Sequence, residues 1–174
     1  MTIIHPTENS ADEAAFEALY RRELATMIAL ATTMTGDRML GADLAYEAMV
    51  RTYGNWAKVG SLDRPGAWVR RVLINLAIDA CRKRSREAAA TARLVPPTSS
   101  EPVDPEGEQF WSAVRALPDR QRAAVVLHYV EDMSILDIAD VLGIAEGTVK
   151  TSLSMARRTL AKTLRTEEVS DGHD

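Results

Sequence analysis

The stretch between Gly147 and Arg165 combines positive charge with short hydroxyl side chains in a pattern suited to contact with nucleic acid. It holds five basic residues and no acidic residue. At helical spacing, an apolar stripe through Val149, Leu153 and Ala156 can pack against a neighbouring helix. The opposite arc then presents ammonium, guanidinium and hydroxyl groups, which hydrogen-bond to phosphates and to base edges. This arc contains Gly147, Thr151, Ser154, Met155, Arg158, Lys162 and Arg165, flanked by Lys150 and Arg157.

A second basic stretch lies upstream, between Arg64 and Arg93. It holds eight basic and two acidic residues, although the whole 174-residue chain carries a net charge of −4. The segment from Leu94 to Phe110, between the two basic stretches, holds four carboxylates and no basic residue. Two separate basic surfaces in an acidic chain favour two contacts with a polyanion, nucleic acid above all, over two solvated helix faces.

The residues just before Gly147 predict a helix-turn-helix that positions the basic arc. Ser134 is suited to cap a helix, and Asp137 three residues later completes a capping-box-like pair. Gly143 suits the left-handed position that ends this helix, and the next helix is expected to begin near Glu146. Such a motif indicates that the second helix inserts into the major groove of duplex DNA.

The whole chain predicts an all-α fold of two small helical domains, because no convincing strand pattern occurs. Helical periodicity predicts further helices at about residues 12–36, 40–56, 65–90, 108–117 and 118–132, with a loop at 57–68. Residues 94–107 are rich in proline, serine and acidic residues and predict a flexible acidic linker. The expected domains are therefore residues 1–93 and residues 108–174.

The sequence lacks the usual marks of enzymes, metalloproteins and membrane proteins. No glycine-rich phosphate loop, Cys/His metal spacing or nucleophile elbow is present, so we expect neither catalysis nor a cofactor. No apolar run approaches the roughly 18–20 residues of a membrane helix, and the first residues do not form a signal peptide pattern. The single cysteine, Cys81, is interpreted as a small packing residue in a reduced, cytoplasmic protein.

Three segments together resemble bacterial RNA polymerase sigma factors of the extracytoplasmic-function (ECF) type, close to the SigE-like actinobacterial subgroup. The stretch "LPDRQRAAVVLHYVEDMSILDIADVLGIAEGTVKTSLSMARRTL" is similar to their C-terminal domain. "RPGAWVRRVLINLAIDACRKRSRE" resembles the helix that melts promoter DNA and reads the −10 element. "GADLAYEAMVRTYGNWAKV" resembles the preceding helix, which binds the polymerase core. The resemblance implies a non-enzymatic subunit that lends promoter specificity to RNA polymerase.

The resemblance also implies roles for individual residues. Those at the −35 element would be Glu146, Thr148, Lys150, Thr151, Ser154, Arg157 and Arg158, with Arg120 and Arg122 on the DNA backbone. Those at the −10 element would be Arg64, Arg71, Asn75, Arg82, Lys83, Arg84 and Arg86, with the loop Val59–Arg64 receiving a flipped base. Those on the polymerase core would be Asp43, Leu44, Glu47 and Met49. Trp56 and Trp68 are either stacking platforms for bases or core residues.

The implied partners are the RNA polymerase core, through its largest subunits, and promoter DNA, with an anti-sigma factor as a further candidate and no membrane insertion. The chain departs from the family pattern at Tyr46, Ala145, Ser152 and Met155. Ala145 cannot cap the recognition helix, and Ser152 and Met155 replace two usual arginines, which implies weaker −35 binding. A sigma-like DNA-binding regulator, or an interaction module that no longer initiates transcription, is therefore the alternative interpretation.

Overall fold

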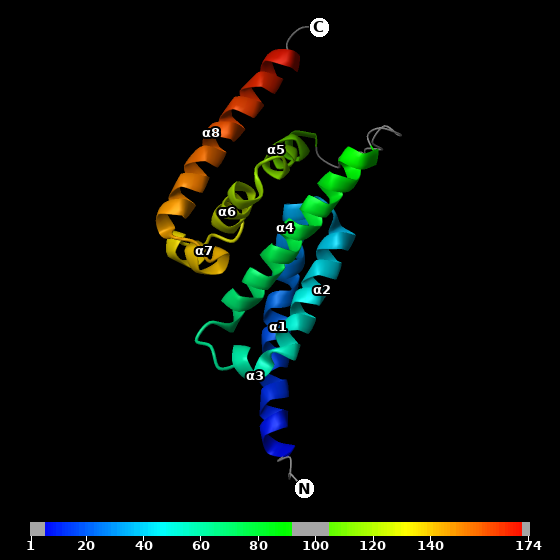
Figure 1. The fold of residues 1–174 in the computed structure, drawn as a ribbon, viewed down its shortest axis with the longest axis vertical. Helices are drawn as coiled ribbons and strands as arrows, with labels where there is room; N and C mark the ends of the chain where they lie inside the picture. Colours follow the sequence, from blue (N-terminus) through cyan, green and yellow to red (C-terminus); the bar gives the residue numbers. More distant parts are fainter. Residues whose placement is uncertain (1–5, 92–104, 172–174) are drawn as a thin grey trace.

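The computed structural model describes the backbone of residues 6–91 and 105–171, which form helices and no strand, so the all-α prediction is confirmed. The helices are α1 (Pro6–Thr35), α2 (Arg38–Gly54), α3 (Trp56–Val59), α4 (Pro65–Thr91), α5 (Pro105–Arg115), α6 (Asp119–Tyr129), α7 (Ile135–Leu142) and α8 (Glu146–Asp171). Figure 1 shows α1, α2 and α4 side by side, with the second half of the chain against one side of this bundle and α8 at the outer edge.

Helices α1, α2 and α4 share one apolar core, because each has a stripe of large apolar residues at helical spacing. Met27 and Leu30 of α1, Met49 of α2, and Leu73 and Ile74 of α4 belong to the same buried cluster, and each is at most 2% exposed. The three helices therefore form a stable platform on which the outward face of α4 is held.

The close approach of α1 and α2 depends on Gly41. A Cβ atom at this position would lie 2.5 Å from Thr32 Oγ1 and 2.7 Å from the backbone nitrogen of Thr32. Asp37 begins α2 by accepting hydrogen bonds from the backbone N–H groups of Met39 and Leu40, at 3.0 and 3.1 Å. A glycine inside the helix and a carboxylate at its start thus fix how α2 lies on α1.

The helix-turn-helix in the second half has the expected geometry. Ser134 Oγ accepts a hydrogen bond from the backbone N–H of Asp137 over 3.1 Å and donates its own hydrogen to the Asp137 carboxylate over 2.7 Å. Gly143 ends α7 with a left-handed φ of 64°. The predicted apolar stripe of α8 is buried, with Val149 and Ala156 fully covered. Packing of this stripe directs the opposite arc of α8 to solvent.

Several predicted boundaries differ from the structure. Helix α5 begins at Pro105, so residues 105–107 of the expected linker are helical, while the rest of that linker, residues 94–104, lies outside the described residues. Residues 56–59, expected largely as loop, form the short helix α3. Helix α6 ends at Tyr129, three residues early, and Asp132 soon after it has a left-handed φ of 51° that no α-helix continues. Among the described helices, none combines the length and apolar character needed to cross a bilayer.

The two halves of the chain pack against each other, chiefly through α4 and α7, with α1 also contacting α5 and α6. Between the halves, Arg70 of α4 lies 3.0 Å from a Glu23 carboxylate oxygen on α1 and 3.6 Å from a Glu131 carboxylate oxygen after α6. Burial raises the pKa of the Glu131 carboxyl, and the Arg70 guanidinium opposes this rise. This largely buried network fixes where α1, α4 and the turn after α6 meet.

Candidate nucleic-acid interface

The residues predicted to face the −35 element are all exposed on α8, which lies at the outer edge of the molecule (Figure 1). Thr151 Oγ1 donates to the carbonyl of Gly147 over 2.8 Å, so its lone pairs stay available to accept a hydrogen bond from a base. Lys150 Nζ lies 4.0 Å from a Glu146 carboxylate oxygen, a loose exposed pair that a phosphate can replace. The arc is therefore open to a duplex along its length.

Two departures from the family pattern have different positions on α8. Ser152 is only 8% exposed, so its side chain belongs to the packed face and does not reach DNA. Met155 is 51% exposed in the same arc as Ser154 and offers an apolar group, which suits contact with a thymine methyl.

The prediction that Arg122 contacts the DNA backbone is wrong for this structure. Its side chain is buried, with Nη1 donating to the carbonyl of Arg115 over 2.7 Å and Nη2 donating to Asp119 Oδ1 over 2.8 Å. Arg120, two residues earlier, is exposed. Arg122 therefore joins α5 to α6, and a periodic sequence pattern offers no signal that separates these two arginines.

Three of the seven −10 candidates already contact acidic groups of the second half. Arg64 pairs with the Asp137 carboxylate at the start of α7. This contact raises the pKa of Arg64 and lowers the pKa of Asp137, as expected for opposite charges in a hydrogen bond. Arg82 Nε donates to Asp119 Oδ2 over 2.6 Å at the start of α6. One of these pairs lies just before α4 and the other in the second half of this helix.

The third contact, made by Arg71, lies between them. Arg71 Nε donates to the carbonyl of Val141 over 3.1 Å, and its Nη2 donates to the carbonyl of Asp140 and lies 3.5 Å from that residue's carboxylate. These carbonyls belong to the last turn of α7, where a helix carries partial negative charge. The end of α7 therefore presents to Arg71 the same type of acceptor as a phosphate.

The other four −10 candidates are exposed and contact the first half or line a cavity. Lys83 Nζ lies 3.9 Å from a Glu87 carboxylate oxygen, and Arg86 Nε donates to the carbonyl of Arg82 over 3.3 Å. Asn75 lines a cavity of about 410 Å³ between α4 and the turn that joins α7 to α8. The structure thus gathers all of the predicted −10 residues along α4 and the residue just before it.

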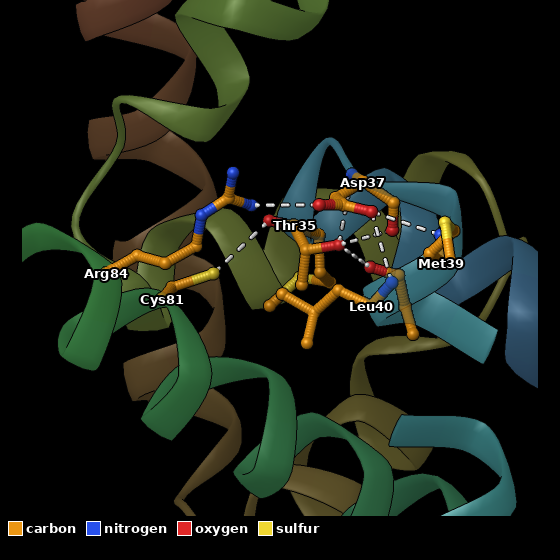
Figure 2. Close-up of polar contacts among 8 residues, drawn as sticks. Thr35, Asp37, Met39, Leu40, Cys81 and Arg84 are labelled. Atoms are coloured by element: carbon orange, nitrogen blue, oxygen red, sulfur yellow. Dashed lines mark hydrogen bonds and ion pairs between the residues drawn. The ribbon is translucent and has the colours of Figure 1, made fainter. Parts of the chain in front are cut away.

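Figure 2 shows how the last of these, Arg84, ties α4 to the start of α2. Its Nη1 lies 3.6 Å from Asp37 Oδ2, while Asp37 Oδ1 caps α2. Nearby, Cys81 Sγ lies 3.6 Å from the carbonyl of Met34. Burial raises the pKa of the Cys81 thiol and keeps it protonated, which fits the interpretation of this cysteine as a packing residue.

The two tryptophans occupy different environments. Trp56 packs its ring on Phe16, with centroids 5.3 Å apart, and is a partly buried residue against the core, with no hydrogen-bond partner for its buried indole nitrogen. Trp68 is half-buried and lines a cavity of about 460 Å³ together with Leu62 and Arg71. The two side chains therefore differ in setting: Trp68 borders a cavity, whereas Trp56 packs against another aromatic ring.

Helix α2 presents an apolar surface that the sequence reasoning missed. Tyr46, Val50 and Tyr53 are 47%, 66% and 54% exposed, and their spacing of four and three residues places them on one face. Met49, predicted to contact the polymerase, is 2% exposed and packs in the core, which corrects that prediction. Of the other predicted contacts, Asp43 and Glu47 are exposed and Leu44 is half-buried. The sequence signal that could have revealed the exposed surface of α2 was a second stripe of apolar residues beside the buried stripe.

Comparisons with known proteins match both halves of the chain. The family models described as Sigma-70 region 2 and as Sigma-70, region 4 match residues 19–87 and 107–160. The RNA polymerase sigma-E factor of Streptomyces avermitilis is 32% identical over 160 residues, which covers 88% of this chain and 87% of that protein. The ECF RNA polymerase sigma factor SigW of Bacillus subtilis is 32% identical over 149 residues, which covers 74% of this chain and 80% of that protein.

Two solved structures have a similar fold. One is the sigma factor RpoE in complex with the anti-sigma factor NepR from Bartonella quintana, with a TM-score of 0.67 and 24% identity, covering 86% of this chain and 96% of that chain. The other is CnrH in complex with the cytosolic domain of CnrY, with a TM-score of 0.64 and 22% identity, covering 88% of this chain and 90% of that chain.

Proposed function

Because the chain belongs to the sigma-70 family, as an RNA polymerase sigma factor of the ECF type, we propose that its two halves hold two elements of one promoter. The chain binds RNA polymerase core and directs promoter-specific initiation of transcription. Residues 1–93 would bind core and recognise and melt the −10 element, residues 94–107 would connect the halves, and residues 108–174 would recognise the −35 element. The supporting observation is one basic helix face in each matched region, on α4 and on α8.

At the −35 element, the exposed arc of α8 would enter the major groove. Thr151 and Ser154, both exposed on this arc, would read base edges, and each good base contact contributes about 1–3 kcal/mol of discrimination. Arg157 and Arg158 would hold phosphates. The complete proposed set is Glu146, Thr148, Lys150, Thr151, Ser154, Arg157 and Arg158.

At the −10 element, α4 would lie along the melted strand. Arg71 and Asn75 would read bases, and a flipped base would enter the cavity beside Trp68, which offsets an unstacking cost of a few kcal/mol. The complete proposed set is Arg64, Arg71, Asn75, Arg82, Lys83, Arg84 and Arg86.

The core-binding surface is proposed on α2. Asp43, Leu44 and Glu47 stay in this set, while Tyr46 and Val50 replace the buried Met49, because their exposed apolar side chains offer area to a partner. Glu47 Oε1 accepts a hydrogen bond from Arg51 Nε over 2.7 Å, so this exposed carboxylate is held by its neighbour on α2.

We further propose that an anti-sigma factor binds the chain. In the solved structures of similar fold, RpoE is in complex with the anti-sigma factor NepR, and CnrH is in complex with the cytosolic domain of CnrY. We also propose a cytoplasmic location, because the chain works with RNA polymerase. The chain carries no catalytic activity of its own, because the polymerase supplies the chemistry of RNA synthesis.

Run-off transcription with purified core polymerase tests the proposed function. Core plus the chain should give transcripts from a limited set of promoters, and mapping their 5′ ends across genomic DNA should reveal a shared pair of −10 and −35 sequences. Core alone is the control. If the chain neither binds core nor changes the transcripts, the proposed function is refuted.

A further inference from the structure

The exposed surface of α8 has two edges of different chemistry. Lys150 and Arg157 form a basic edge, because their separation of seven residues is close to two helical turns. An uncharged edge contains Thr148, Met155 and Thr159, which are separated by seven and four residues. All five side chains are exposed. At about 100° per residue, the two edges lie roughly 140–180° apart around the helix, so they face opposite sides.

Met155 is the large apolar side chain of the uncharged edge. It is 51% exposed, whereas the stripe that packs α8 on the second half passes through Val149, Leu153 and Ala156 and is buried. The packing of α8 therefore does not account for a methionine at this position. Ser152, three residues earlier, is 8% exposed and marks where the buried side of the helix ends.

The major groove of DNA offers different partners to the two edges. The groove is about 12 Å wide and a helix with its side chains is about 10–12 Å across, so a bound helix contacts the groove on both edges. Phosphates line the walls and attract the ammonium of Lys150 and the guanidinium of Arg157. An uncharged edge against a wall would remove water from phosphate oxygens and give them no new hydrogen bond, which is unfavourable. The uncharged edge is therefore expected to face the bases.

On the basis of the proposed function, we propose that Met155 is a specificity-determining residue that recognises the C5-methyl group of a thymine in the −35 element. In the major groove, the base pairs present hydrogen-bond donors and acceptors, and thymine adds a methyl group. The methionine side chain has no donor, and its sulfur is only a weak acceptor. Of the four bases, thymine therefore offers Met155 the most favourable contact, and the flexible thioether can adapt to the position of the methyl group.

Selection of duplexes by the holoenzyme is the first test. Core polymerase with the wild-type chain is mixed with a duplex library randomised across the −35 element, and the bound duplexes are sequenced. The wild type should enrich thymine at one position or more. Met155→Ala should lose the enrichment at one of these positions and keep the rest of the selected sequence. A selected −35 element that contains no thymine on either strand would overturn the proposal.

Replacement of single thymines by deoxyuridine is the second test, because it removes the methyl group and leaves base pairing intact. At the thymine that Met155 contacts, this replacement should weaken binding of the wild-type holoenzyme about threefold to fivefold, as expected for one apolar group returned to water. Met155→Ala should bind the thymine and deoxyuridine duplexes equally. Alanine is a strong helix former, so this variant preserves α8. Met155→Leu, which keeps an apolar side chain, should retain the difference.

The matched control is Arg157→Ala, on the basic edge of the same helix. It should weaken binding to every duplex and keep the full difference between thymine and deoxyuridine. Equal differences in the wild type and Met155→Ala, or no difference at any thymine of the selected element, would overturn the proposal and leave the proposed function standing. A holoenzyme that enriches no −35 sequence at all would refute both, so the two failures are distinguishable.

Discussion

Arg82 Nε donates to Asp119 Oδ2 over 2.6 Å, and the other oxygen of the same carboxylate accepts from Arg122 Nη2 over 2.8 Å. Asp119 thus joins an exposed arginine of α4, which we assign to DNA, to a buried arginine of the second half. The two pairs use different oxygens of Asp119. Loss of the Arg82 contact therefore leaves the Asp119–Arg122 pair inside the second half in place.

Arg122→Ala should lower the free energy of unfolding by about 2–4 kcal/mol, because it leaves the Arg115 carbonyl and one oxygen of Asp119 without their buried donor. Arg120→Ala is the matched control: the side chain is exposed two residues away, and its loss should change stability by less than about 0.5 kcal/mol. Urea unfolding of both variants gives the comparison. Similar losses in the two would contradict the structural role of Arg122.

Gly41→Ala should lower the free energy of unfolding by about 1–3 kcal/mol, because the added methyl group would lie 2.5 Å from Thr32 Oγ1 and must push α1 and α2 apart. Gly54→Ala, at the end of the same helix, meets no atom within 4 Å and should be neutral or slightly stabilising. Thermal unfolding followed by circular dichroism measures both. A stable Gly41→Ala variant would show that the two helices do not need this close approach.

Local chemistry made the helix-turn-helix predictable from sequence. Ser134, Asp137 and Gly143 act within a few residues of their own positions, so the cap and the helix end could be predicted directly. The buried stripe of α8, through Val149 and Ala156, followed from helical periodicity in the same way. Features that depend only on neighbours in sequence are those that a single chain reveals.

Features that depend on tertiary packing were missed. Helix α2 has apolar residues on two faces, and periodicity alone could not tell that Met49 packs inward while Val50 faces solvent. Arg122 is buried although Arg120 is exposed, since Arg122 meets a carbonyl of α5 that only the folded chain brings to it. The contact of α4 with α7 joins residues about 70 apart in the chain, for which the sequence carried no signal.

The pH dependence of the free energy of unfolding should reveal the burial of the Glu131 carboxyl. Burial raises the pKa of its carboxyl above the ordinary value of 4.5, so the folded chain holds this proton more tightly than the unfolded chain does. The resulting stabilisation is fully present below pH 4.5 and is lost as the pH rises through the raised pKa. Glu131→Gln has no carboxyl group to ionise at this position and keeps the same stability contribution at every pH. The stability of this variant relative to the wild type should therefore increase as the pH rises above 4.5.

Urea unfolding at a series of pH values measures this difference for Glu131→Gln. Asp132→Asn is the control, because Asp132 is exposed, adjacent, and in a left-handed conformation that asparagine also adopts. This variant shows what removing an exposed carboxylate beside Glu131 does to the same stability curve. A constant offset for Glu131→Gln at every pH would contradict the burial of this carboxyl.

The salt dependence of −35 binding should separate phosphate-binding from base-reading side chains on α8. Arg157 and Arg158 are exposed on α8. Removing one arginine from a phosphate should reduce the slope of log affinity against log salt by roughly 0.9. Arg157→Ala/Arg158→Ala should therefore weaken binding of the holoenzyme to all duplexes alike. Ser154→Ala should instead weaken binding mainly to the cognate −35 sequence and leave the slope unchanged, because a hydrogen bond to a base releases no counterion.

Holoenzyme binding to duplexes with matched and scrambled −35 sequences, measured across a salt series, gives both the affinity and the slope. The two variants serve as controls for each other, because Ser154 and the arginines lie on the same exposed arc of α8. A reduced slope in Ser154→Ala, or an unchanged slope in Arg157→Ala/Arg158→Ala, would reverse the roles assigned to these side chains.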